Sequence, residues 1–206
     1  MSKLLYIIRH GQTNLNKGGI VQGRGVDSDL NDLGIRQGKA FYEAYKNEQF
    51  DKIYISTLKR TEQTVRPFIE NGHSVEKLVG LDELDWGIHE GLKPTEENKV
   101  EYERITDLWS KGDYEVRMVK GESPLEVKKR QLEALKYILE KQAEKKILIC
   151  MHGRAMRVLL TILSGQELSK MDEFPHTNLS LYIVRVDEDN FKVETFNNIA
   201  HLDGIN

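Results

Sequence analysis

The order of apolar and polar residues along the chain predicts alternating strands and helices. Residues 3–8 and 146–151 are apolar at nearly every position, which is typical of strands that are buried on both faces of a sheet. Residues 52–55 form a shorter run of the same kind, and we expect another short strand near residues 76–81. Because parallel strands are usually joined through helices, this alternation predicts an α/β domain with a mainly parallel sheet.

Capping residues mark where the helices between these strands begin. Asn31 is the expected cap of a helix that runs to about Lys46, and Thr57 is the expected cap of a helix over residues 58–70. A further helix is expected to follow the strand at 146–151.

The clearest helix start in the chain is at Ser123. This residue is followed by proline and then, three residues after the cap, by Glu126, which is the pattern of a capping box. We expect this helix to extend to about Glu144. Its expected apolar side consists of Leu125, Leu132, Leu135 and Leu139.

Two polar segments interrupt the alternation. Residues 11–29 are rich in glycine and too irregular for a helix, so we expect a long loop, and such loops are often functional. Residues 92–120 are highly charged and helical only in part, so we expect a mostly helical insertion. Towards the end of the chain, residues 179–186 and 191–196 predict two strands joined by a turn at 187–190.

The composition is that of an ordinary globular protein. The 206 residues suit a single domain, residues 1–206, and the net charge of −3 provides no overall attraction to nucleic acid or to a membrane surface. Cys150 is the only cysteine, so an internal disulfide is impossible. The first apolar run is too short for a signal peptide and no later run could span a membrane, so we expect a cytoplasmic protein.

Residues able to carry chemistry gather where the predicted strands end. Arg9 and His10 follow the first strand, and His152 follows the strand at 146–151. Arg60 lies in the first turn of the helix after residues 52–55, and the next strand leads to Glu83. Because ligands of open α/β sheets bind beyond the carboxyl ends of the strands, we expect these side chains to share one pocket.

This set of side chains suits phosphoryl transfer. The transferring group carries negative charge on its oxygens, and the planar guanidinium of arginine matches that geometry. A neutral imidazole is a competent nucleophile near neutral pH, because its ordinary pKa is about 6.5. Arginines can neutralise the phosphoryl charge without a metal ion, and the sequence has no tight metal-ligand spacing. We therefore expect neither a metal nor another cofactor.

Longer motifs surround these residues. Residues 9–16 read Arg-His-Gly-Gln-Thr-Asn-Leu-Asn, and residues 56–64 read Ser-Thr-Leu-Lys-Arg-Thr-Glu-Gln-Thr. Both resemble the histidine phosphatase superfamily, in its phosphoglycerate mutase-like branch. The resemblance implies a three-layer α/β/α sandwich of that kind with an insertion at 92–120. Further matches follow in family order at Leu81-Asp82-Glu83, Gly87, Glu90-Gly91, Gly121-Glu122-Ser123, His152-Gly153, Arg157 and Asn178.

The resemblance also implies a role for each matching residue. His10 is the implied nucleophile, which becomes phosphohistidine. Glu83 is the implied proton donor to the leaving oxygen and then the base for water. Gln22 and Gly23 stand where family members often contact the substrate. The implied ligands of the phosphoryl group are Arg9, Asn16, Arg60, His152 and Gly153.

Three functions remain open for such a site. A phosphatase passes the phosphoryl group from His10 to water, whereas a cofactor-dependent phosphoglycerate mutase returns it to a second hydroxyl. The mutases usually carry paired arginines in the insertion, and residues 92–122 contain no adjacent arginine pair. We therefore expect a metal-independent phosphatase that acts on a small phosphorylated metabolite, with the mutase as the alternative. A non-catalytic phosphate-binding protein is less favoured, because the nucleophile and both arginines are present.

Several nearby residues have two interpretations. His89 and Arg154 either contact the substrate or are solvated. Trp86 and Trp109 either pack in the core or line the mouth of the pocket. His176 has no clear partner in the sequence, and we assign it no role.

Overall fold

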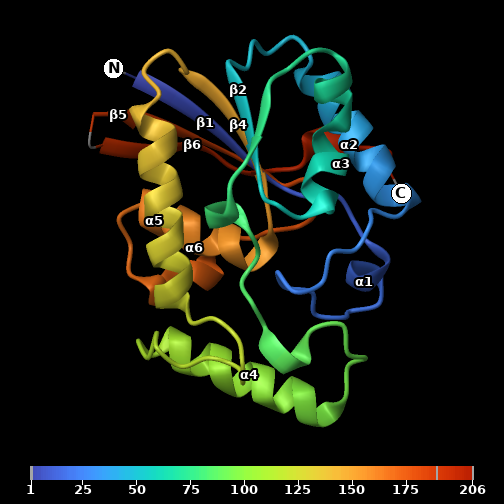
Figure 1. The fold of residues 1–206 in the computed structure, drawn as a ribbon, viewed down its shortest axis with the longest axis vertical. Helices are drawn as coiled ribbons and strands as arrows, with labels where there is room; N and C mark the ends of the chain where they lie inside the picture. Colours follow the sequence, from blue (N-terminus) through green and yellow to red (C-terminus); the bar gives the residue numbers. More distant parts are fainter. Residues whose placement is uncertain (1, 189, 206) are drawn as a thin grey trace.

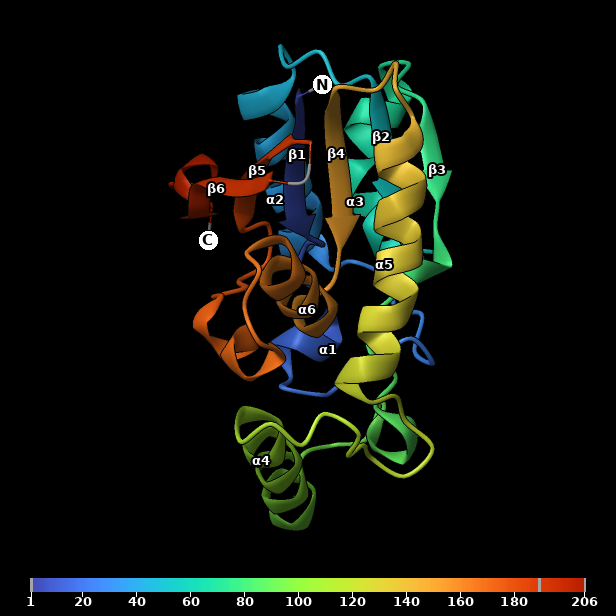
Figure 2. The ribbon, with the colours of Figure 1, turned by 90° about the vertical axis from the view of Figure 1, so that its left-hand side faces the viewer.

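Six strands form one sheet in the computed structural model, which describes residues 2–188 and 190–205. The strands are β1 (Ser2–Arg9), β2 (Lys52–Ile55), β3 (Val75–Lys77), β4 (Lys146–Met151), β5 (Leu181–Asp187) and β6 (Asn190–Asn198). Their order is β3-β2-β4-β1-β5-β6, and the first four are parallel to one another (Figure 2). β5 pairs antiparallel with β1, and β6 pairs antiparallel with β5. The predicted mainly parallel sheet is therefore confirmed.

Helices cover both faces of the sheet, which makes the fold a three-layer α/β/α sandwich (Figures 1 and 2). Leu5 and Ile7 of β1 belong to the core beneath α5 and α6, whereas Tyr6 and Ile8 belong to the core beneath α2 and α3. Successive side chains of a strand point to opposite faces, so a strand between two helical layers must be apolar throughout. The covering helices are α2 (Asp32–Tyr45), α3 (Lys59–Glu70), α5 (Pro124–Glu140) and α6 (Gly153–Leu163).

The expected insertion forms a separate lobe beyond the carboxyl ends of the strands, at the lower end of the molecule in Figure 1. Its single long helix is α4 (Glu96–Ser110). Ile105 and Trp109 of α4 are buried in a third core cluster that also contains Val158 of α6. The insertion is thus packed onto the sandwich by apolar contacts of its own.

The two ends of this insertion meet. The Ile88 N–H donates to the Val119 carbonyl oxygen (3.1 Å), and the Glu122 N–H donates to that of Asp85 (2.8 Å). The chain therefore leaves and re-enters the sandwich at adjacent backbone positions. Four 3-10 helices complete the described part of the fold: η1 (Val79–Leu81), η2 (Gly87–His89), η3 (Leu168–Glu173) and η4 (Ala200–Leu202).

The segment expected to be an uninterrupted loop contains a short helix, α1 (Asn14–Lys17). Thr13 and Asn16 form a capping box at its start. The Thr13 hydroxyl oxygen accepts from the Asn16 N–H (3.0 Å), and the Asn16 side-chain oxygen accepts from the Thr13 N–H (3.2 Å). One turn is too short to show helical periodicity, so local side-chain hydrogen bonds decide the conformation.

Two expectations around α3 are wrong. Thr57 does not cap the helix, because its N–H and hydroxyl both bind the Asp82 carboxylate (2.8 and 2.9 Å), and Leu58 takes the cap position without a side-chain bond. The strand expected near residues 76–81 is shorter and earlier, and η1 replaces its second half. Both differences bring Asp82 next to the start of α3.

The buried face of α5 also differs from the expectation. Ser123 caps the helix through the predicted capping box, but the helix ends four residues before the expected Glu144. Leu125 and Leu132 are 38% and 43% exposed, while Gln131 is fully buried and its amide donates to the Ala155 carbonyl oxygen (2.7 Å). Contact with α6 therefore determines which side of α5 is buried.

The last two strands of the sheet, β5 and β6, are neighbours in sequence and pair with each other. The final two strands form the expected hairpin, and residue 189 of the turn expected at 187–190 lies outside the described residues. In the described part of the chain, no helix combines the length and the apolar character that crossing a membrane requires.

Asn31 caps α2 as predicted, and its side chain offers a test of the fold. Its oxygen accepts from the Gly34 N–H (2.9 Å), and its amide donates to the Gln12 side-chain oxygen (2.9 Å). We expect Asn31→Ala to lower the free energy of unfolding by about 1 kcal/mol in urea denaturation, because the cap acceptor is lost. Asn31→Asp keeps that acceptor and is expected to retain most of the stability. Equal losses in both variants would show that the Gln12 contact matters instead.

Candidate active site

Two histidines lie side by side because the strands before them are neighbours. β1 and β4 pair in parallel with Arg9 opposite Met151, and the His10 N–H donates to the Met151 carbonyl oxygen (2.9 Å). The ring centroids of His10 and His152 are 5.1 Å apart. Both rings are almost completely buried, with exposed fractions of 2% and 0%.

The hydrogen bonds of His10 define its neutral form. Its Nδ1 lies 2.7 Å from the Gly11 carbonyl oxygen, and because a carbonyl oxygen can only accept, Nδ1 carries the proton. Burial, reinforced by Arg60 and Arg9, holds the pKa of His10 well below its usual value of 6.5. The ring is therefore neutral at physiological pH, and Nε2 keeps its lone pair.

His152 adopts the opposite tautomer. Arg60 Nε donates to His152 Nδ1 (3.2 Å), so this nitrogen is unprotonated, and Nε2 donates its proton to the Ser56 hydroxyl oxygen (2.7 Å). Burial and the adjacent Arg60 also hold the pKa of His152 well below its usual range. The two rings are thus neutral with their protons on different nitrogens.

A short chain of hydroxyl groups supports this arrangement. The Ser56 oxygen accepts from the Leu58 N–H (3.1 Å) as well as from His152, and it lies 3.1 Å from the Thr61 hydroxyl oxygen. Thr61 donates to the Leu58 carbonyl oxygen (2.8 Å), so the Ser56 proton is directed to Thr61. Ser56 belongs to a segment that resembles the family, but no role was expected for it, because β2 meets β4 only in the folded sheet.

Two arginines place positive charge beside the rings. Arg60 is fully buried and donates to the carbonyl oxygens of Val26 (2.7 Å) and Gly23 (3.2 Å). Arg9 donates to the His176 carbonyl oxygen (2.7 Å), and its buried Nε has no partner. Burial lowers the pKa of Arg9 to about 10, so this side chain remains charged at neutral pH. An unpartnered donor on a buried cation suits an anionic ligand.

Glu83 is held at the start of α6. Its Oε1 accepts from the N–H groups of Leu84 (2.9 Å) and Ala155 (2.8 Å), and its Oε2 accepts from the Arg154 N–H (3.2 Å). The free N–H groups at a helix start are suited to a carboxylate. Glu83 is therefore fixed in position at the rim of the same pocket.

Arg130 of α5 holds the backbone that carries Glu83. Its guanidinium donates to the carbonyl oxygens of Gly80 (3.0 Å), Asp82 (2.9 Å) and Glu83 (3.0 Å), and it pairs with Glu122 (3.0 Å). The sequence contains no signal for this role, because the partners are mostly backbone oxygens that are distant along the chain.

A cavity of about 170 Å³ opens onto these groups. It brings together most of the predicted site residues, while Arg60 and His152 are buried beside His10 and Gly23 supports Arg60 through its carbonyl oxygen. A Cβ atom at Gly23 would lie 2.0 Å from Glu90 Oε1, so the residue must be small. The predicted residues that line the cavity are Arg9, His10, Asn16, Gln22, Glu83 and Gly153.

Asn16 and Gln22 reach the cavity with side chains that are already hydrogen bonded. The Asn16 oxygen accepts from the Thr13 N–H (3.2 Å) and the Asn178 amide (3.4 Å). Gln22 donates to the Thr13 hydroxyl oxygen (2.7 Å) and accepts from the Ser28 hydroxyl (2.6 Å). In this structure both residues therefore stabilise the loop around the pocket.

His176, to which we assigned no role, lines the cavity next to Gly153. A Cβ atom on Gly153 would lie 2.4 Å from the His176 ring, so glycine permits this approach. Burial and the nearby Arg9 lower the pKa of His176 to about 2, which keeps its ring neutral. Asn178 donates to the His10 carbonyl oxygen (2.8 Å).

Arg154 is buried rather than solvated. It donates to Asp172 (2.7 Å) and to the Tyr102 hydroxyl oxygen (2.8 Å), and it lies 5.9 and 5.7 Å from the ring centroids of Trp86 and Trp109. Trp109 packs in the core, whereas Trp86 also lines the cavity.

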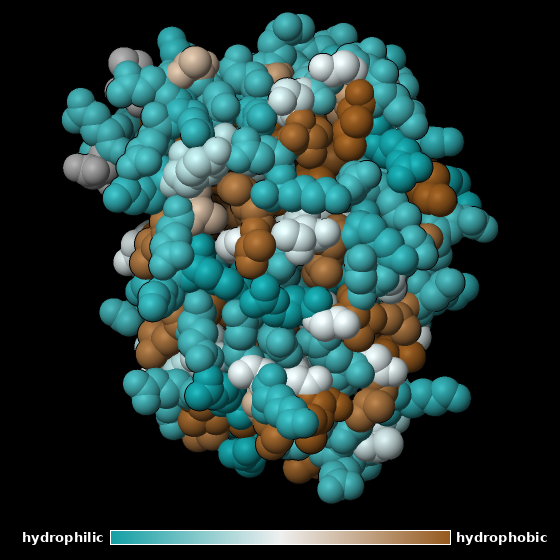
Figure 3. All heavy atoms as spheres, in the orientation of Figure 1, coloured by the Kyte–Doolittle hydropathy of each residue, from teal (hydrophilic) through white to brown (hydrophobic). Residues whose placement is uncertain are grey.

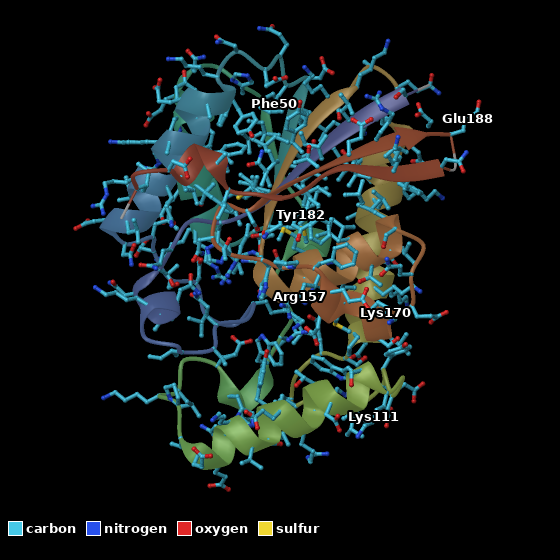
Figure 4. All side chains as sticks on the ribbon, turned by 180° about the vertical axis from the view of Figure 1, so that it is seen from behind. Phe50, Lys111, Arg157, Lys170, Tyr182 and Glu188 are labelled. Carbon is cyan, nitrogen blue, oxygen red and sulfur yellow. The ribbon has the colours of Figure 1, made fainter. Side chains whose placement is uncertain are left out.

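Arg157, one turn further along α6, also binds Asp172 and donates to the Phe174 carbonyl oxygen (3.0 Å). Figure 4 shows Arg157 between Tyr182 of the sheet and the insertion that carries Lys111. Burial lowers the pKa of Arg157. Its guanidinium is directed towards Asp172 and Phe174 rather than into the cavity.

Two other expectations concern metal binding and thiol chemistry. Within residues 2–188 and 190–205, no group of three or more His, Cys, Asp or Glu side chains could hold a metal ion. Cys150 is a buried residue of β4, as expected, and burial raises the pKa of its thiol, which disfavours the reactive thiolate.

The opposite tautomers of the two histidines can be observed directly. We expect ¹⁵N–¹H spectra of the imidazoles to show His10 protonated on Nδ1 and His152 on Nε2, with both rings neutral from pH 7 down to pH 5. Ser56→Ala removes the acceptor for His152 and is expected to perturb that tautomer while His10 keeps its own. Titration of either ring near its ordinary pKa of about 6.5 would contradict this arrangement.

Comparison with known proteins identifies relatives of this chain. A Yersinia pestis protein named "Probable phosphoglycerate mutase GpmB" is 31% identical over 205 residues, which cover 97% of this chain and 94% of the relative. The structure of YhfR from Bacillus stearothermophilus superposes with a TM-score of 0.83 at 24% identity, covering 97% and 99% of the two chains.

A mycobacterial glucosyl-3-phosphoglycerate phosphatase has the same fold, with a TM-score of 0.82 at 21% identity and coverage of 97% and 100%. Residues 5–199 match the family model of the histidine phosphatase superfamily (branch 1). This range includes the segments that carry His10, Arg60, Glu83 and His152. The chain belongs to branch 1 of the histidine phosphatase superfamily.

Proposed function

We propose that this protein is a phosphatase that hydrolyses a small phosphomonoester through a phosphohistidine intermediate on His10. The observation that carries the proposal is the neutral, buried His10 ring, whose Nδ1 is bound to the Gly11 carbonyl oxygen and whose Nε2 is left with its lone pair. Two buried guanidinium groups lie beside it. This is the arrangement that nucleophilic attack on a phosphoryl group requires.

In the first step, His10 Nε2 attacks phosphorus and the bond to the ester oxygen breaks. The unpartnered Arg9 Nε supplies one donor to the phosphoryl oxygens. Arg60, whose nitrogens are bound to His152, Val26 and Gly23, stabilises their negative charge by its nearby positive charge. Glu83, a carboxylate in the free protein, takes up a proton when the substrate binds and gives it to the leaving alcohol oxygen. His152 keeps Arg60 oriented through the bond between Arg60 Nε and its Nδ1.

In the second step, water attacks the phosphohistidine. Glu83, now a carboxylate, accepts a proton from the water, and the bond between phosphorus and Nε2 breaks. Inorganic phosphate leaves and Glu83 is again protonated. No metal ion or other cofactor takes part in this scheme, because the guanidinium groups supply the positive charge.

Hydrolysis is favoured over mutase activity by the cations available near the pocket. A phosphoglycerate carries a carboxylate besides its phosphate, and a mutase must hold both groups. Beyond Arg9, the arginine that lines the pocket is Arg154, whose guanidinium is already bound to Asp172 and Tyr102. The relative at 31% identity that is named a mutase keeps the second activity as the alternative to test.

Replacing His10 distinguishes an enzyme from a non-catalytic phosphate-binding protein. We expect His10→Ala to lower phosphate release from p-nitrophenyl phosphate on the order of 10³-fold or more, because no covalent intermediate can form. His73→Ala removes a histidine remote from the cavity and serves as the control, with a rate close to that of the unchanged protein. In the unchanged protein, a ³²P-labelled phosphomonoester should leave an acid-labile label on His10. An unchanged rate of phosphate release in His10→Ala would contradict the assignment of His10 as the nucleophile. Binding of a phosphomonoester to the unchanged protein without turnover would indicate a binding protein.

The fate of the phosphoryl group separates the two enzymatic activities. We expect a panel of phosphomonoesters to yield inorganic phosphate and free alcohol in equal amounts, because water accepts the phosphoryl group. With 3-phosphoglycerate and a bisphosphoglycerate primer, we expect little 2-phosphoglycerate by NMR. Rapid isomerisation without phosphate release would refute the phosphatase proposal.

A further inference from the structure

A second and larger cavity adjoins the phosphate pocket. Its volume is about 480 Å³, against about 170 Å³ for the pocket that contains His10. Val21, Trp86 and Tyr102 line both cavities, so the two are adjacent. Cavities of this size are typical of sites for small organic molecules, and three phosphoryl oxygens alone do not require such a volume.

The lining of the larger cavity is mostly apolar. Trp86 and Met118 are 4% and 2% exposed, whereas Leu92 and Pro94 line the cavity as exposed residues. Among the described residues that line it, Lys99 is the only lysine or arginine, and Glu96 carries the opposite charge. The cavity therefore lacks the cluster of cations that a second phosphate or carboxylate would require.

Trp86 and Tyr102, which line both cavities, are held in place by contacts with neighbouring side chains. The rings of Trp86 and Tyr102 are 5.1 Å apart, and Trp86 lies 5.7 Å from Trp109. Arg154 donates to the Tyr102 hydroxyl oxygen (2.8 Å) from the side of the phosphate pocket. A fixed aromatic surface of this kind favours flat apolar groups, because little side-chain entropy is lost on binding.

His89 belongs to this cavity rather than to the phosphate pocket. It is 9% exposed, and its Nε2 lies 2.9 Å from Glu101 Oε2 on α4. This contact places η2 next to α4 on the two sides of the cavity. Figure 3 shows hydrophobic side chains at the lower end of the molecule, where Figure 1 places α4.

We propose that the cavity beneath α4 binds the alcohol part of the substrate, and that this part is an apolar, ring-bearing group rather than a small polyanion. The phosphate ester then lies beside His10, and the chain that joins ring to ester passes Trp86 and Tyr102. The proposal rests on the phosphatase function for turnover, but binding by the cavity can be measured without turnover.

Binding is tested with phosphonates, which the enzyme cannot hydrolyse. We expect 4-phenylbutylphosphonate to bind about tenfold or more tightly than butylphosphonate in calorimetry, because a phenyl ring is buried in the cavity. Equal affinities, or no binding of either compound, would overturn the proposal. Turnover is measured separately with 3-phenylpropyl and propyl phosphate, whose leaving alcohols are of similar acidity.

Two matched variants assign the effect to the cavity. Leu92 lines the cavity and is 49% exposed, whereas Val100 is 56% exposed on α4 and is not among the lining residues. Leu92→Asp should abolish most of the preference for the phenyl compounds over the alkyl compounds. Val100→Asp should alter neither this preference nor propyl phosphate hydrolysis, and a loss of the preference in both variants would overturn the assignment.

The outcomes for binding and for turnover are distinguishable. Selective phenylbutylphosphonate binding without hydrolysis of any ester would retain the cavity assignment and reject the phosphatase function. Hydrolysis of both esters at equal rates, with equal phosphonate affinities, would retain the phosphatase and reject the cavity assignment.

Discussion

Buried positive charge is the constraint on which the candidate site depends. Arg9 and Arg60 lie in the protein interior beside two imidazoles, and burial lowers the pKa of both guanidinium groups. Isolated buried charges are costly unless they are paired or solvated. Here three backbone carbonyl oxygens accept hydrogen bonds from the two guanidinium groups, and Glu83 supplies a nearby negative charge. Burial, reinforced by the same positive charges, keeps both histidines neutral, so the cations that attract an anion also help to maintain a nucleophilic ring.

The sequence was sufficient to predict the centre of this arrangement. β1, β2 and β4 are apolar runs between two helical layers, so hydrophobicity alone marked them, and β2 and β4 have the predicted bounds. Adjacent parallel strands end at one edge, which is why His10 and His152 were expected together. Those predictions needed only the direction and the neighbours of the strands.

Other contacts could not be predicted from the sequence, because they depend on packing between segments that are distant along the chain. Arg130 binds backbone oxygens about fifty residues away, and such acceptors leave no mark in a sequence. His176 approaches the pocket only because Gly153 has no side chain. Likewise Thr57 is a good cap by type, but the Asp82 carboxylate competes for its hydroxyl and N–H. In each case a tertiary partner outweighs the local preference.

The closed ends of the insertion have a consequence for how such proteins can diverge. Residues 88 and 119 are joined by a backbone hydrogen bond, and a second bond links Asp85 to Glu122. The intervening segment can therefore change in length or composition while its attachment to the sandwich stays in place. Selection can then act on the residues of this lobe that line the larger cavity, provided that the packing of Ile105 and Trp109 against α6 is kept. A single scaffold of this type can acquire new ligands through changes within one segment.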